Sequence, residues 1–329
     1  MRFGGNSLFG EGIESKKNKK DNGIASRYRK LIGDKLKEES HEKGAILEAF
    51  ENKSNISSQD IINFLFGIEE FSQKLMVDGD LKVLFLLHNS ALLYHAAQVM
   101  KSEGFGIPKH IGLSGNGSRI LEITNGSDNL NDPYRESLKD LATRIFRKVY
   151  EQEDSHTIKF VMSSAPKEST TFGGIKGFDS HMDSDKTYKI NVGDGKKNYE
   201  KGEIKEYHYQ DIHDDQAMLE DTEGNKVSFQ KEVISNIQEF LEFFFGQLWS
   251  DSAFVDAYSV SGAIDKEVLK KYAIDESSLK DSLINALDAR IGDQEKEFSE
   301  TLFFDPITNM LYFLSKQLVD IQSEFKTSV

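Results

Sequence analysis

A glycine-rich segment near residue 115 has the residue types and spacing that suit a bound nucleotide. The apolar strand pattern Ile111–Leu113 runs directly into the candidate cofactor-binding residues Gly115, Asn116, Gly117, Ser118 and Arg119. Glycine has no Cβ and tolerates positive φ, so Gly115 and Gly117 would let the backbone approach ribose or phosphate closely. Arg119 would stack its guanidinium plane on adenine, while Ser118 would hydrogen-bond base or ribose. The alternatives are a tight strand-to-helix turn for the glycines and a surface ion pair for Arg119.

A second glycine-bearing segment follows another apolar strand pattern, Thr157–Met162. Pro166 begins a turn that leads into a helix of small residues containing Gly173, Gly174 and Gly177. We expect Gly173 to be part of the same nucleotide site. The alternative is that these glycines only allow close packing of the helix.

Other polar residues do not form a recognisable catalytic pattern. Three groups stand out: Asp179, His181, Asp183 and Asp185; His208, His213, Asp214 and Asp215; and His88 with His95. The first lacks the Gly and Glu of an EF-hand loop, and the second lacks an H-E-x-x-H pattern, so we interpret both as polar surface. The third group, His88 with His95, lies on an apolar helix. We interpret these residues as buried histidines whose ring nitrogens are hydrogen-bonded. We therefore assign no catalytic residue and no metal ligand.

Composition excludes several classes of protein. A net charge of −14 argues against a nucleic-acid partner, because affinity for phosphate backbones requires clustered Lys and Arg. There is no cysteine, which removes disulfides, thiol nucleophiles and Cys-ligated zinc. The longest apolar block, 81–100, is interrupted by Lys82, His88, Asn89 and Ser90, so we expect a buried helix and no membrane partner. No signal-peptide pattern opens the chain, and we expect a cytoplasmic protein.

The predicted elements alternate in the way that an α/β fold requires. The pattern indicates a helix over 81–104 with Asp80 as N-cap, a strand over 110–113, a helix over 134–150 and a strand over 157–162. Short alternating runs between 186 and 230, including 204–209 and 218–229, predict a small antiparallel β insert with a turn at 223–225. Helical patterns then fill 231–325. Strand ends in such folds carry the site.

The two glycine segments, in this order and with an amphipathic helix between them, resemble the second lobe of the actin, sugar-kinase and heat-shock-chaperone ATPase superfamily. The segment Gly115–Ile120 is similar to the chaperones' adenosine motif, Gly-Gly-Ser-Thr-Arg-Ile. Pro166, Glu168, Gly173 and Gly177 match a further pattern of the superfamily's final helix. The opening residues 3–8 resemble the stretch that leads into its outer subdomain. The resemblance covers 1–10 and 81–177, and it does not extend to 178–329.

The resemblance implies a partial actin-like ATPase lobe divided into four parts. These are a turn with a mostly helical outer subdomain (1–80), an α/β core (81–178), a small β insert (179–230) and a C-terminal helical region (231–329). ATP or ADP with Mg²⁺ would be the cofactor. The superfamily's two phosphate loops are not found in this sequence, so the chain would supply the adenine side of the site and would not hydrolyse ATP by itself. Its first partner would be the N-terminal lobe.

An interaction module without enzymatic activity is the alternative interpretation. In that case the ATPase-like core is a scaffold, and a protein partner binds the C-terminal helices. These helices are rich in aromatic residues: Phe240, Phe243, Phe244, Phe245 and Trp249. Helical spacing also explains most of these residues as core. A sugar-kinase relative is a third reading, but no sugar-binding carboxylate can be identified.

Overall fold

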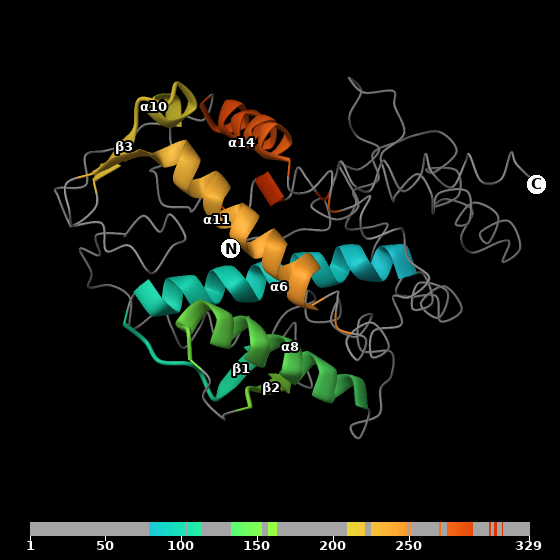
Figure 1. The fold of residues 1–329 in the computed structure, drawn as a ribbon. Helices are drawn as coiled ribbons and strands as arrows, with labels where there is room; N and C mark the ends of the chain where they lie inside the picture. Colours follow the sequence, from blue (N-terminus) through green and yellow to red (C-terminus); the bar gives the residue numbers. More distant parts are fainter. Residues whose placement is uncertain are drawn as a thin grey trace, which may run out of the picture.

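The computed structural model describes residues 79–102, 104–113, 133–152, 157–162, 209–220, 225–248, 275–291, and the single positions 251, 270, 303, 306, 307 and 311. The elements in chain order are α6 (Gly79–Ser102), β1 (His110–Leu113), α8 (Pro133–Tyr150), β2 (Lys159–Met162), α10 (Tyr209–His213), β3 (Met218–Glu220), β4 (Lys226–Ser228), α11 (Phe229–Phe243), the π-helix η3 (Phe244–Leu248) and α14 (Glu276–Ile291). This part is mostly helical with two small sheets, which fits a partial α/β fold (Figure 1).

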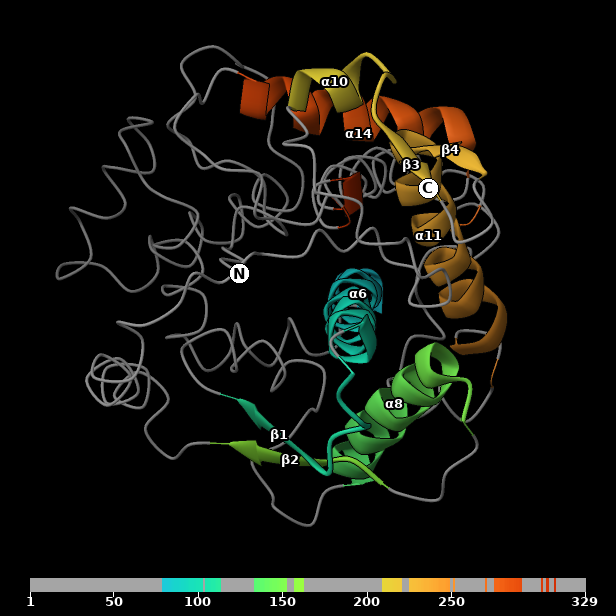
Figure 2. The same cartoon turned by 90° about the vertical axis from the view of Figure 1, so that its left-hand side faces the viewer.

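The helix α6 lies between two layers of the fold. Figure 2 shows α8, β1 and β2 on one side of α6 and α11 on another. Its buried side chains meet both layers, since α6 packs on α8 and Tyr94 packs against Phe240 of α11 at a ring separation of 5.2 Å. The prediction of a buried helix is therefore confirmed. Asp80 lies within the first turn of α6 and does not precede the helix as a cap.

The C-terminal end of α6 is a glycine-dependent Schellman motif. Gly104 has φ of +78°, and its N–H donates to the carbonyl of Lys101 at 3.0 Å. The N–H of Phe105 donates to the carbonyl of Met100 at 2.9 Å. These two bonds satisfy carbonyls that the helix itself leaves without donors. The predicted stop at Gly104 is confirmed.

We expect Gly104→Ala to destabilise the protein by about 1 kcal/mol, because a Cβ is strained at positive φ. A Cβ at Gly104 would have no atom within 4 Å, so crowding adds nothing to this strain. Gly106→Ala is the matched control, since Gly106 has equally open space and no positive φ. Urea unfolding of both variants tests this, and equal midpoints would contradict it.

A β-α-β unit follows α6. The strands β1 and β2 pair in parallel, with His110 opposite Lys159 and Leu113 opposite Met162. Helix α8 connects them in sequence and buries Leu141, Ile145 and Phe146. The hydroxyl of Thr143 in α8 accepts a hydrogen bond of 3.2 Å from the N–H of Ile158, which ties the start of β2 to the helix. The predicted strand–helix–strand order is confirmed here.

The region after residue 209 combines a hairpin with long helices. The strands β3 and β4 are antiparallel, with Glu220 opposite Lys226, so the predicted pair of short antiparallel strands is confirmed, while positions 223 and 224 of the predicted turn lie outside the described residues. The expected strand 204–209 is wrong at Tyr209, which begins α10 instead. The helix α11 begins at Phe229, with Ser228 as its N-cap, and therefore crosses the expected division between 230 and 231. The second of the two strands expected within 218–229 ends at Ser228, one residue before the expected limit, for the same reason.

The aromatic residues of α11 and η3 belong to the core. The side chains of Phe240, Phe243, Phe244 and Phe245 are all at most 4% exposed. Phe240 packs against Tyr94, Phe244 and Phe303, with ring separations of 5.2, 6.3 and 5.9 Å. These four rings therefore form packing contacts and do not offer a surface to a partner, while Trp249 lies outside the described residues.

Ionic contacts join the β-α-β unit to the C-terminal helices. Arg144 of α8 lies 2.6 Å from a carboxylate oxygen of Asp251 and 2.7 Å from one of Asp140. Lys148 of α8 lies 2.9 Å from Glu239 of α11. All five side chains are at least 30% exposed, so we expect each pair to contribute little, about 0–1 kcal/mol.

Candidate functional site

The predicted nucleotide-binding residues follow the two described strands in the sequence. Gly115, Asn116, Gly117, Ser118, Arg119 and Gly173 are all outside the described residues. The two strands before them are described, and they are parallel and end in register at Leu113 and Met162. The carboxyl ends of the two described strands therefore lie at the same edge of the sheet. In open α/β sheets, ligands bind outside the carboxyl ends of the strands.

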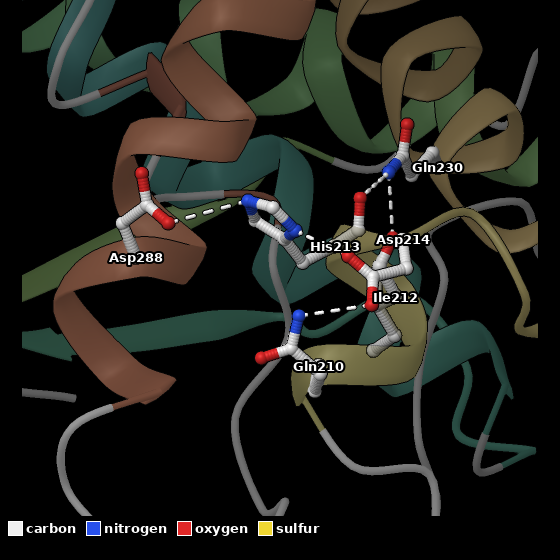
Figure 3. A network of polar contacts seen from close by, with 6 residues as sticks. All are labelled: Gln210, Ile212, His213, Asp214, Gln230 and Asp288. Carbon is white, nitrogen blue, oxygen red and sulfur yellow. Dashed lines mark hydrogen bonds and ion pairs between the residues drawn. The ribbon is translucent and has the colours of Figure 1, made fainter.

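A second candidate site surrounds His213 at the end of α10, and Figure 3 shows it closely. Its Nδ1 lies 2.8 Å from an oxygen of Asp214, and its Nε2 lies 3.2 Å from an oxygen of Asp288 in α14. The second oxygen of Asp214 accepts a hydrogen bond of 2.9 Å from Gln210. These hydrogen bonds, with that from His213 first, lower the pKa of the Asp214 carboxyl.

The backbone around His213 is fixed by its neighbours in sequence and space. Asp215 has φ of +56°, and the N–H groups of Asp215 and Gln216 donate to the carbonyls of Ile212 and Asp211, closing α10 as a second Schellman motif. From α11, the amide of Gln230 donates to the carbonyls of Ile212 and His213 at 2.6 and 2.8 Å.

The β3–β4 hairpin is held to the end of α10, because the hydroxyl of Ser228 donates a hydrogen bond to the Asp215 carboxylate. That hydroxyl also accepts the N–H of Lys231 at 3.2 Å and so caps α11. One serine therefore connects the end of α10, the end of β4 and the start of α11.

The His213 arrangement does not suit general-base catalysis or metal binding. A catalytic imidazole needs one ring nitrogen directed at the substrate, with the other held by an orienting group. Here each ring nitrogen already faces a carboxylate. Among the residues that the structure describes, no group of three His, Asp or Glu side chains could hold a metal ion. Asp214 and Asp215 are exposed, which fits the prediction of polar surface at 213–215. The other predicted polar positions, Asp179–Asp185 and His208, lie outside the described ranges.

The histidines of α6 are buried among apolar side chains. His88 and His95 are 3% and 0% exposed, and the ring of His95 stacks on Phe303 at 5.2 Å. Burial lowers the pKa of both imidazoles to about 4, against smaller raising effects of hydrogen bonds with Asn89 and Gln98 respectively. Both rings are therefore neutral at pH 7, as the interpretation of buried histidines requires.

A buried amide pair lies farther along the same helix. Gln98 donates to Asn236 of α11 at 2.6 Å, and Asn236 donates back at 3.4 Å. Both side chains are buried, so each satisfies a polar group that water cannot reach. Sequence reasoning missed this contact and also the role of Asp288, because neither residue carries a local pattern and the partners are far apart along the chain.

Comparisons with known proteins give no relative for this chain. No family model, no curated protein and no solved structure matches it. No helix within the described ranges is long and apolar enough to cross a bilayer. The function proposed next therefore depends on the residues of this chain and on the geometry of its two parallel strands.

Proposed function

We propose that this chain provides the adenine-side half of an ATP-binding site in an actin-like or chaperone-like ATPase, and that it does not hydrolyse ATP by itself. The observation that carries the proposal is the in-register end of the parallel strands β1 and β2. In the sequence, β1 is followed directly by Gly115–Ile120, which resembles the superfamily's adenosine motif, and the segment Pro166–Gly177 after β2 resembles a pattern of its final helix. Ligands of open α/β sheets bind outside the carboxyl ends of the strands, and both segments follow such ends in the sequence.

The roles of the residues follow from their chemistry. Arg119 stacks on the adenine ring, and Ser118 hydrogen-bonds the base or ribose. Gly115 and Gly117 bring backbone N–H groups close to ribose or phosphate, with Asn116 between them, and Gly173 completes the pocket from the second segment. Phosphate and Mg²⁺ would be held largely by the N-terminal lobe that the resemblance implies, which is why the chain alone should bind nucleotide weakly.

The interaction-module alternative receives less support. Its aromatic residues 240 and 243–245 are buried in the core, so a partner would have to bind exposed positions such as Ser235 and Glu242 of α11. No exposed apolar patch on the described faces of α11 favours such a partner. A protein partner at these helices stays a prediction.

Calorimetric titration with ATP and ADP in the presence of Mg²⁺ tests the proposal. We expect weak, saturable binding to the wild-type chain and a loss of about tenfold in affinity in Arg119→Ala, since a stacked guanidinium contributes about 1–2 kcal/mol. Arg119→Lys keeps the charge but loses the planar stack, so it should be closer to Arg119→Ala than to wild type.

Arg144→Ala is the matched control, because it also removes one arginine but from the partly exposed α8–Asp251 ion pair. It should bind nucleotide as the wild type does. Absence of binding at millimolar nucleotide, or equal affinity of Arg119→Ala and wild type, would contradict the proposal.

A further inference from the structure

The imidazole of His213 is placed between carboxylates from two different elements (Figure 3). Asp214 lies at the end of α10 itself, whereas Asp288 lies on α14. A neutral imidazole has one N–H and can donate to only one carboxylate, and its other nitrogen then presents a lone pair to the second one. The imidazolium ion donates from both nitrogens. Both contacts are therefore favourable together only when the ring is protonated.

The two contacts differ in what they connect. The contact to Asp214 is the shorter, 2.8 Å against 3.2 Å, and it lies within one turn of chain. We expect the neutral ring to keep its proton on Nδ1, facing Asp214. Deprotonation then removes the N–H that faces Asp288, which is the contact joining α10 to α14.

Among the described contacts of the ring, the one with Asp288 joins the two helices. The helix α10 packs on α14 and on α11. From α14 the facing charged group is Asp288, and from the end of α10 it is Asp214. From α11 the side chain that reaches the end of α10 is the uncharged amide of Gln230, and Asp215 is bonded to the Ser228 hydroxyl.

We propose that His213 is a pH-sensitive latch, which holds α10 on α14 while its imidazole is protonated and loosens this contact when it is neutral. Ser228 and Gln230 tie the end of α10 to the end of β4 and the start of α11, so the opening is confined to the contact between α10 and α14. The side chains are partly exposed, with Asp288 at 60%, so the latch biases a local opening and does not control folding of the whole chain.

Amide hydrogen exchange of the full chain tests the latch, with protection factors corrected for the intrinsic rate at each pH. Raising the pH from about 5 to about 8 should lower the protection of α10 by about two- to fivefold, the factor that an exposed ion pair supplies. Asp288→Asn should remove this dependence. Asp281→Asn alters another exposed carboxylate of α14 and should keep it.

Ring ¹⁵N shifts of His213 give the independent measurement, because they report its protonation directly. The fall in protection should have the same midpoint as this titration. Protection that does not change with pH in the wild type, a fall that persists in Asp288→Asn, or a midpoint displaced from the ring titration would each overturn the proposal.

Discussion

Acidification from about pH 7 to about pH 4 should remove about 3 kcal/mol of folding free energy for each of the two histidines of α6. The pKa of His88 and His95 is lowered to about 4 by burial, from 6.5 for a free histidine. Below pH 6.5 the unfolded chain takes up protons that the folded chain does not, so stability falls as the pH decreases through this range. The two losses together are a large part of the about 5–15 kcal/mol that stabilises an average domain.

Urea unfolding at a series of pH values measures this loss. The expected slope between pH 4 and 6.5 is about 1.4 kcal/mol per pH unit for each histidine. His88→Gln and His95→Gln should each remove one histidine's share of the slope, whatever they do to stability at pH 7. The carboxylates of Asp214 and Asp275, whose pKa values are lowered by hydrogen bonds from His213 and Ser277 respectively, titrate below this range.

The control for the pH effect is His110→Gln. His110 begins β1 and its side chain is exposed, so this variant controls for the loss of a histidine outside the core. Equal slopes in the wild type and the His88→Gln, His95→Gln double variant would show that the buried rings do not govern the acid sensitivity.

Phe240→Ala should destabilise the protein by about 3–5 kcal/mol, the usual cost of a large cavity in a packed core. The ring of Phe240 is 0% exposed, and it packs against Tyr94 of α6, Phe244 of η3 and Phe303. It therefore joins three segments that are far apart in the sequence. Removal of the Phe240 ring takes one packing contact away from each of these three segments.

Phe105→Ala is the matched control, because it deletes the same side chain where 63% of it is already exposed. We expect a change below about 1 kcal/mol there. Urea unfolding at pH 7 compares the two variants, and similar losses would mean that Phe240 does not lie in a common core. Phe240→Leu should be intermediate, since it fills part of the cavity.

The local elements were largely predictable from the sequence. The apolar periodicity of α6 and α8, the stop at Gly104 and the hairpin before α11 depend on contacts between residues close in the chain, and such patterns are visible without the tertiary structure. The errors also have local causes. Tyr209 was expected in a strand because apolar and polar residues alternate in its segment. It begins the short helix α10 instead, and the side chain of Gln230 donates a hydrogen bond to the last carbonyl of this helix.

What the sequence determined by itself is the order of strands, helices and glycine segments, because periodicity and turn chemistry are properties of neighbouring residues. It also determined that His88 and His95 share one helix face. Only the tertiary structure decided that the two strands pair in parallel and end in register, that Gln98 meets Asn236, and that Asp288 faces His213. Those contacts join residues separated by 49 to 138 positions, the difference in their numbers, and side-chain burial and chain crossing bring them together.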